Sequence, residues 1–174
     1  TVWQNGYPWV ARYGGQAGLH DGPCATLTLD GGKIYAMDRE STLYCYDQAT
    51  GTELWHRDIV QELGFQCLQS ERGETSSPVI EGNLILFCFG DAGAALDKNN
   101  GSKVWASPGV ADQAAFPTAY IYTSGSDRIA AVVSMTGGQG GRCSGVKVST
   151  GEIVWSFLPP YGFSCSDLIV YGDK

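Results

Sequence analysis

The sequence has no long apolar run. Its longest uninterrupted apolar segment, residues 84–89, has six residues, whereas a helix that crosses a membrane needs about 20. Residues 1–6 contain neither the basic nor the apolar region of a signal peptide. The sequence therefore predicts no membrane span in this segment.

Positive charge is also scarce. The 174 residues include 11 Lys and Arg against 18 Asp and Glu, which gives a net charge of −7. A nucleic-acid-binding protein needs a basic surface, so this balance disfavours a nucleic-acid partner. By contrast, 24 glycines and a hydrophobic fraction of 43% indicate a turn-rich globular chain rather than a disordered one.

Closely spaced cysteine pairs are absent. Zinc ribbons and redox motifs need such pairs because both sulfurs must reach one metal ion or each other. We therefore predict no metal site, and we expect most cysteines to be small buried residues on strands. The even count also permits disulfides, without fixing their pairing, and is compatible with an oxidising compartment. The six cysteines are Cys24, Cys45, Cys67, Cys88, Cys143 and Cys165.

A nine-residue motif recurs every 50 residues. Residues 47–55 read DQATGTELW, residues 97–105 read DKNNGSKVW, and residues 147–155 read KVSTGEIVW. The glycines fall at 51, 101 and 151, and the tryptophans at 55, 105 and 155. Trp3 fits the end of an earlier copy, whereas Trp9 lies outside the pattern. Internal repeats of this length indicate a repetitive architecture.

A second element, a short apolar strand that ends in a glycine turn, recurs at 24–33, 75–84 and 165–174. Each unit then reads strand, glycine turn, strand, loop, strand, Asp-x-x-Thr-Gly turn and strand. Glycine supplies the positive φ that closes a type I turn with a bulge. Residues 58–64 form the best short-helix candidate, with Asp58 as N-cap and Gly64 as its C-terminal stop.

Four-stranded units of about 50 residues predict an all-β fold of β-propeller blades. The Asp-x-x-Thr-Gly-x-x-x-Trp pattern resembles the repeat of pyrroloquinoline-quinone-type (PQQ-like) propellers. This quinoprotein alcohol dehydrogenase-like superfamily includes the dehydrogenases and BamB. Lys147 departs from the pattern because it replaces the aspartate. The resemblance implies that Trp55, Trp105 and Trp155 pack between blades.

We expect about three complete blades and two partial ones. Because propellers of this superfamily typically have eight blades, or about 400 residues, we expect the chain to be a fragment of a longer ring. The predicted boundaries are 1–23 for the end of a preceding blade and a linker, 24–57 for a blade, 58–74 for a linker insertion, 75–107 and 108–157 for two blades, and 158–174 for the start of the next blade.

Two linkers carry about ten more residues than the linker that follows Trp155. Propeller loops often bind ligands, so these insertions are either a partner or ligand surface or decoration of the blade edges. Their candidate residues are Tyr7, Trp9, Tyr13, His20, Phe65, Gln66 and Arg72.

No other motif identifies a catalytic, cofactor-binding or metal-binding residue. Residues 137–142 read GGQGGR, but no lysine and no helix follow, so a turn between strands is expected rather than a phosphate loop. Arg142 on that turn is either a ligand contact or an ordinary exposed arginine. His20 lies beside Asp21, yet no nucleophile elbow accompanies it. His56 is expected on the surface of an outer strand.

The resemblance implies what a quinone enzyme would need: a tryptophan and a disulfide of adjacent cysteines around the quinone, calcium held by carboxylate and amide oxygens, and an aspartate base. The chain has no adjacent cysteines, and none of its carboxylates aligns with these roles. We therefore predict a non-catalytic, BamB-like scaffold, periplasmic or otherwise extracytoplasmic, that binds other proteins through its loops or rim. One alternative is part of a PQQ- and calcium-dependent alcohol or sugar dehydrogenase. A second is a carbohydrate- or polymer-binding propeller that uses Tyr7, Trp9 and Tyr13.

Overall fold

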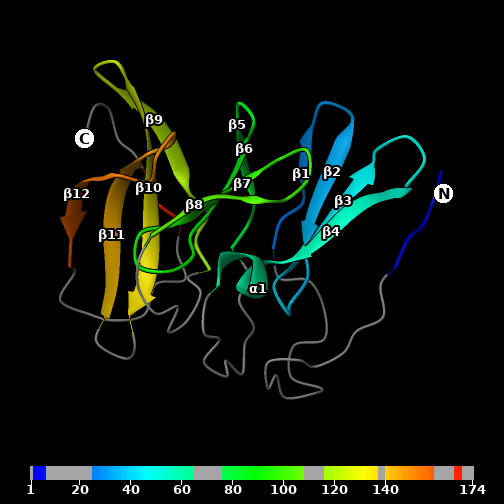
Figure 1. The fold of residues 1–174 in the computed structure, drawn as a ribbon, viewed down its shortest axis with the longest axis horizontal. Coiled ribbons are helices and arrows are strands. Elements are labelled where there is room, and N and C mark those ends of the chain that lie inside the picture. Colours follow the sequence, from blue (N-terminus) through cyan, green and yellow to red (C-terminus); the bar gives the residue numbers. More distant parts are fainter. Residues whose placement is uncertain are drawn as a thin grey trace.

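Three four-stranded antiparallel sheets follow one another along the chain (Figure 1). The structure is a computed structural model that describes residues 2–6, 25–64, 76–107, 116–136, 140–158 and 167–169. Within each sheet the strands lie in chain order, so every connection joins neighbours. The predicted all-β fold of propeller blades is confirmed. In the described ranges, no helix is long and apolar enough to cross a membrane.

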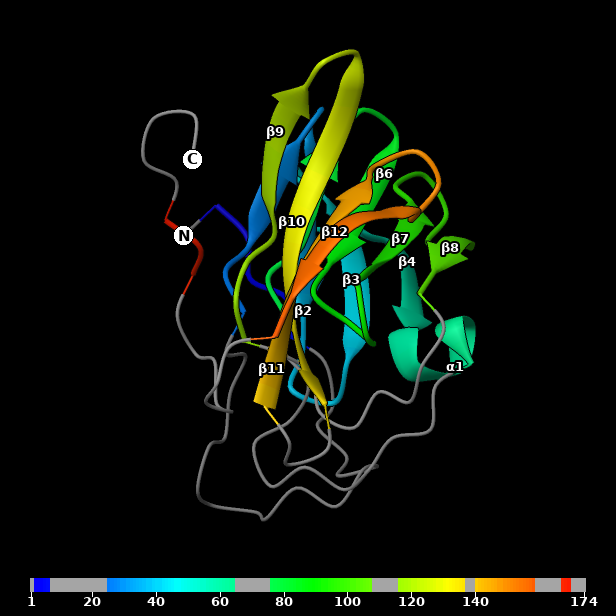
Figure 2. The same ribbon diagram turned by 90° about the vertical axis from the view of Figure 1, so that its left-hand side faces the viewer.

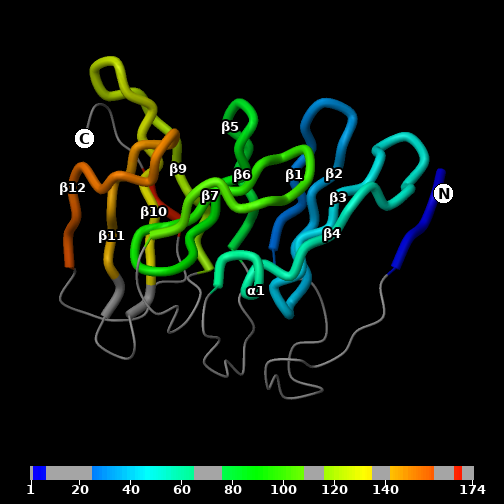
Figure 3. Tube along the Cα trace, viewed as in Figure 1, coloured from blue at the N-terminus to red at the C-terminus, as the bar shows by residue number. Residues whose placement is uncertain are grey.

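The first sheet contains β1 (Thr28–Asp30), β2 (Lys33–Met37), β3 (Thr42–Asp47) and β4 (Glu53–Asp58). The second contains β5 (Val79–Glu81), β6 (Leu84–Phe87), β7 (Ala94–Asp97) and β8 (Lys103–Ala106). The third contains β9 (Tyr120–Ser124), β10 (Asp127–Thr136), β11 (Gly140–Lys147) and β12 (Ile153–Phe157). Figure 3 shows the sheets side by side, with the third sheet at one end of the stack, and Figure 2 views the stack from that end.

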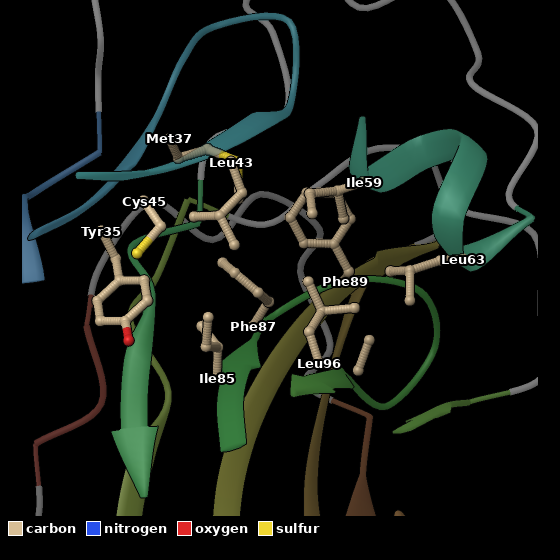
Figure 4. Packing of buried hydrophobic residues seen from close by; sticks show 11 residues of the cluster. Tyr35, Met37, Leu43, Cys45, Ile59, Leu63, Ile85, Phe87, Phe89 and Leu96 are labelled. Carbon is tan, nitrogen blue, oxygen red and sulfur yellow. The ribbon is translucent and has the colours of Figure 1, made fainter. Parts of the chain in front are cut away.

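Two apolar clusters hold the three sheets together. The first lies between the first and second sheets, where Tyr35 and Leu43 meet Ile85 and Phe87 (Figure 4). The second lies between the second and third sheets and includes Leu86, Trp105, Val132 and Val146. The middle sheet is therefore covered on both faces, which explains why its strands β6 and β7 are almost entirely buried apolar residues.

The repeated turn has the same backbone geometry in all three sheets. Gly51, Gly101 and Gly151 have φ values of 72°, 73° and 74°, and each of their N–H groups donates to the carbonyl four residues before it at 2.8 Å. A bulge follows in each sheet, as the motif predicts. The third turn keeps this geometry although Lys147 has replaced the aspartate, because the backbone bonds and the glycine define it.

The predicted short helix is present as α1 (Ile59–Leu63). The Asp58 carboxylate accepts from the Gln61 N–H, and Gly64 closes the helix in the left-handed conformation. Ile59 and Leu63 point into the first apolar cluster (Figure 4). The helix therefore seals one end of the contact between the first and second sheets.

Candidate functional site

The tryptophan of each repeat lies on the turn glycine of the next sheet, wherever that glycine is described. A Cβ on the glycine would approach the indole ring to 2.5–2.8 Å, so only glycine fits beneath it. This contact joins each sheet to the next near its outer strand and confirms the packing role implied for Trp55 and Trp105. The three pairs are Trp3 with Gly51, Trp55 with Gly101, and Trp105 with Gly151.

The indole N–H groups are satisfied unequally. Trp3 Nε1 donates to the Gln48 carbonyl at 3.0 Å, and Trp105 Nε1 donates to the Val148 carbonyl at 2.8 Å. The equivalent carbonyl for Trp55 belongs to Lys98, but it accepts from the Tyr35 hydroxyl at 3.1 Å instead. Within the described ranges, Trp55 Nε1 is buried without a hydrogen-bond partner.

No following sheet is described opposite Trp155, so the packing role that the resemblance implied for this residue stays a prediction. Its ring lies on Gly145 of its own sheet, and its Nε1 donates to the Tyr122 hydroxyl at 2.7 Å. Its side chain remains 39% exposed, against 9% for Trp105.

Polar contacts also join the sheets just before the first strand of each sheet, which we call their inner side. The Thr26 N–H donates to Ser77 Oγ at 3.0 Å, between the first and second sheets. Ser76 Oγ donates to the Pro117 carbonyl at 3.1 Å and accepts from the Cys88 N–H at 3.0 Å. Each sheet is thus attached to the next at both its inner and its outer side.

Ion pairs between sheets reinforce these contacts. Lys98 Nζ lies 2.8 Å from the Asp30 carboxylate, and Arg128 pairs with Glu81 through two hydrogen bonds of 2.8 and 3.1 Å. The bonds from Arg128 hold the pKa of the Glu81 carboxyl below its ordinary value. Together the contacts make the three sheets a stiff stack.

The β2–β3 turn is a buried polar site that the sequence analysis missed. Residues 38–42 read DREST, which looks like a solvated turn, yet all five are at least 95% buried. Asp38 Oδ1 accepts from the Thr42 N–H at 2.6 Å, and the Ser41 carbonyl accepts from the Ile59 N–H at 2.9 Å. No signal in the sequence marks this burial, because it depends on tertiary packing.

A shallow, open cavity of about 330 Å³ lies beside α1 and β4. His56 is exposed on β4, as expected, and its Nδ1 lies 2.7 Å from Glu53 Oε1. The hollow is polar and carries both signs of charge, so it offers no single ligand chemistry. Its lining residues are Thr42, His56, Arg57, Asp58, Gln61 and Glu62.

The prediction of a turn is wrong for residues 140–142 of the glycine-rich stretch, because they belong to β11, and Arg142 therefore lies on a strand and not on a turn. Gly140 begins β11 opposite Thr136 of β10, and Arg142 lies opposite Ser134. Arg142 Nε is buried and has no hydrogen-bond partner among the described residues. Residues 137–139 lie outside the described ranges. So do all the linker candidates: Tyr7, Trp9, Tyr13, His20, Phe65, Gln66 and Arg72.

Within the described ranges, the structure does not bring together the donors that the resemblance implies for a quinone and calcium site. Cys45, Cys88 and Cys143 are free thiols on separate strands or loops, whereas the resemblance implies a disulfide of adjacent cysteines. No group of three or more His, Cys, Asp or Glu suited to a metal ion occurs within the described ranges.

β12 is the most exposed apolar strand of the structure. Ile153, Val154, Trp155 and Phe157 are all exposed, and Leu158 continues the run. None of these residues carries a charge. The equivalents of Trp155 and Phe157 in the first sheet, Trp55 and Arg57, lie against Gly101 of the second sheet.

Comparison with known proteins identifies the family. A family model described as outer membrane protein assembly factor BamB matches residues 1–157. The chain belongs to this BamB family. No curated protein matches the sequence.

Solved structures share the fold at low sequence identity. A quinohemoprotein alcohol dehydrogenase from Comamonas testosteroni is 20% identical, with a TM-score of 0.55 over 77% of this chain and 20% of the other. BamB from Moraxella catarrhalis is 17% identical, with a TM-score of 0.52 over 78% of this chain and 36% of the other. The computationally designed protein Ika4 is 10% identical, with a TM-score of 0.53 over 94% of this chain and 89% of the other. The chain thus spans well under half the length of the two natural structures.

Proposed function

We propose that the chain is part of a non-catalytic scaffold that binds other proteins in the periplasm or another extracytoplasmic compartment. The observation that carries this proposal is the BamB family model, which covers residues 1–157 and takes its name from an assembly factor. The acidic composition, with a net charge of −7, favours protein partners over nucleic acids.

The stack of sheets supports a scaffolding role because it is stiff. The tryptophan contacts and the inner hydrogen bonds fix each sheet against its neighbour at two separated points. A partner that touches two blades therefore meets a surface that needs little ordering on binding, which lowers the entropic cost of association.

The test is a native mass spectrum of the natural full-length protein, purified under mild conditions and compared with its denatured mass. A scaffold should carry protein partners in fixed stoichiometry and no small ligand. A bound mass equal to a quinone plus calcium, together with dye-linked alcohol or sugar oxidation, would overturn the proposal in favour of the dehydrogenase alternative. Osmotic-shock fractionation of the native cells tests the compartment, since a cytoplasmic location would contradict it.

A further inference from the structure

The hairpin of β10 and β11 is longer than its equivalent in the second sheet. β10 has ten residues and β11 has eight, whereas β6 and β7 have four each (Figure 1). The pairing of β10 with β11 runs without a register shift from Ile129 opposite Lys147 to Thr136 opposite Gly140. The third sheet therefore carries an extension of regular strand. Segments added to a repeated scaffold are typical places for binding sites.

One face of this extension is polar and lies toward the second sheet. Val132 belongs to the apolar cluster between the second and third sheets, and Ser134 follows it on the same face of β10. Ser134 Oγ donates to the Asp91 carbonyl in the β6–β7 turn at 2.8 Å, which fixes the direction of this face. On β11, Ser144 lies opposite Val132. Arg142 lies opposite Ser134, so both β11 residues share the face.

Two polar atoms on this face are buried and unsatisfied. Ser144 is 0% exposed, and its Oγ has no hydrogen-bond partner in the described part of the chain. Arg142 Nε is also buried without a described partner, although the side chain of Arg142 as a whole is only partly buried. Unsatisfied buried donors destabilise a fold, and native proteins retain few of them. Because both atoms can donate, one bound acceptor would satisfy both.

The charge of Arg142 has no counter-ion within the described ranges. Lys98, Arg128 and Lys147 each lie 2.8 Å from a carboxylate oxygen. None of the described carboxylates pairs with Arg142 in this way. The chain has 18 Asp and Glu against 11 Lys and Arg, so carboxylates are not scarce. A partly desolvated cation is costly unless an anion accompanies it. The unpaired arginine of an acidic chain therefore indicates an anionic ligand.

A carboxylate fits these donors better than a phosphate does. The planar guanidinium group donates two parallel hydrogen bonds to the two oxygens of a carboxylate, and the Ser144 hydroxyl group supplies a further donor. A carboxylate carries one negative charge and so neutralises Arg142 alone. A phosphate monoester carries nearly two at pH 7, which would leave excess negative charge in a chain whose net charge is already −7.

We propose that Arg142 and Ser144 form a binding site for a carboxylate between the second and third sheets. Arg142 supplies the positive charge and can be reached from solvent because it is only partly buried. Ser144 supplies a hydroxyl donor from a fully buried position. The carboxylate belongs either to a small organic acid or to an acidic residue of a partner protein, since the same donors recognise both. The site goes beyond the proposed scaffolding function and does not depend on it.

The NMR signal of the Arg142 Nε–H group is the most direct probe. It is recorded on the full chain labelled selectively at the arginine Nε atoms and is assigned by its loss in Arg142→Lys, which lacks the guanidinium group. We expect sodium acetate, exchanged for sodium chloride at constant ionic strength, to shift the signal saturably. Half-saturation should occur on the order of 10 mM, because the ligand is so small. Acetamide, which is neutral and similar in shape, should not shift it.

Two results of this titration would overturn the proposal. An Nε–H signal that acetate does not move is expected if only a water molecule bridges the two donors. An equal response to acetamide would show that charge has no part in the binding.

Matched charge variants test the site by a second measurement. Acetate that binds the folded state should raise its melting temperature. Arg142→Gln should abolish this rise. Arg57→Gln removes the same charge from β4, where the Arg57 guanidinium group donates to the His56 carbonyl at 2.9 Å, and should retain the rise. An equal loss in both variants would identify a general effect of charge and contradict the site.

Ser144→Ala tests the second donor and also decides if Arg142→Gln fails to fold. Without acetate the variant should be at least as stable as the parent, because the hydroxyl group has no described partner to lose. With acetate, the dissociation constant should rise about fivefold, as expected for the loss of one hydrogen bond. Lower stability without acetate, combined with unchanged acetate binding, would show that the hydroxyl group is structural and would overturn its role.

Two further ligands identify the chemistry and its source. Sodium phosphate should bind more weakly than acetate, and tighter binding would overturn the assignment to a carboxylate. A peptide with blocked ends and one glutamate between glycines presents the same group on a chain. Tighter binding of this peptide than of acetate would identify a partner residue as the source, whereas binding of acetate alone would identify a free acid. Failure of all these ligands would remove the site and leave the scaffolding function to its own test.

Discussion

The indole ring of Trp105 lies so close to Gly151 that a Cβ on the glycine would sit 2.5 Å from the ring. The two residues belong to different sheets, and Trp105 also donates to the carbonyl of Val148, three residues before that glycine. One side chain thus joins the outer side of the second sheet to the turn of the third.

Replacement of Gly151 by alanine should strongly destabilise the fold. The variant suffers both a positive φ of 74° and a clash with Trp105, and we expect a loss of about 3 kcal/mol. Gly125→Ala is the matched control, because its φ is 60° and nothing lies within 4 Å of the added Cβ. The control should lose only about 1 kcal/mol. Urea unfolding measures both, and equal losses would show that the ring contact contributes nothing.

Replacement by phenylalanine should destabilise the protein more at Trp105 than at Trp55. Trp105→Phe removes a buried hydrogen bond to Val148, whereas Trp55→Phe removes an N–H that is already unsatisfied among the described residues. We expect Trp105→Phe to cost about 1 kcal/mol more than Trp55→Phe. The free energies of unfolding of the two variants give this difference directly. A larger cost for Trp55→Phe would show that its N–H has a partner.

The pair of Glu81 and Arg128 should make stability depend on pH in the acid range. Hydrogen bonds from Arg128 lower the pKa of Glu81 from its ordinary 4.5. The stabilisation is therefore fully present above pH 4.5 and is lost as pH falls through the lower folded value. Since both groups are partly exposed, the effect should be at most about 1 kcal/mol. Glu81→Gln should flatten the melting temperature between pH 5 and 3, and an unchanged slope would contradict this assignment.

Thiol reactivity should follow burial. Burial raises the pKa of the Cys88 thiol to about 12 and also raises the pKa of Cys143, which is only half-buried. Because the thiolate is the reactive form, iodoacetamide at pH 8 should leave Cys88 unmodified in the folded protein and label Cys143 slowly. Peptide mapping by mass spectrometry distinguishes the two sites. In urea both should react at the same rate, and fast labelling of Cys88 in the folded state would contradict its packing.

The sequence predicted those features that depend on local chemistry. The nine-residue motif that recurs every 50 residues located the repeated turns, because the turn closes at a glycine with positive φ. Asp58 and Gly64 marked both ends of α1 for the same kind of reason, since each satisfies backbone groups within a few residues of itself. Even the turn at Lys147 could be placed, because Gly151 and the backbone bonds remain.

Features that depend on neighbours could not be predicted. The sequence analysis did not place β9, because the glycine turn after it, at Gly125, comes fewer than 50 residues after the equivalent turn at Gly82. The long strands β10 and β11 restore the 50-residue spacing at the next turn. The burial of residues 38–42 depends on tertiary packing. The roles of the linker residues remain predictions, as they lie outside the described ranges.

Each tryptophan contacts the turn glycine of the following repeat. This arrangement has a consequence for how the number of repeats in such chains can change. A duplicated unit contains one glycine, which contacts the tryptophan of the preceding unit, and one tryptophan, which contacts the glycine of the following unit. It therefore fits between two existing units through the same contacts that they already make. Gain or loss of a whole unit is therefore the mildest change in length that this architecture can undergo. The tryptophan follows the glycine of its own unit by four residues. A small deletion between them would change this spacing and would disturb the contacts with both the preceding and the following unit.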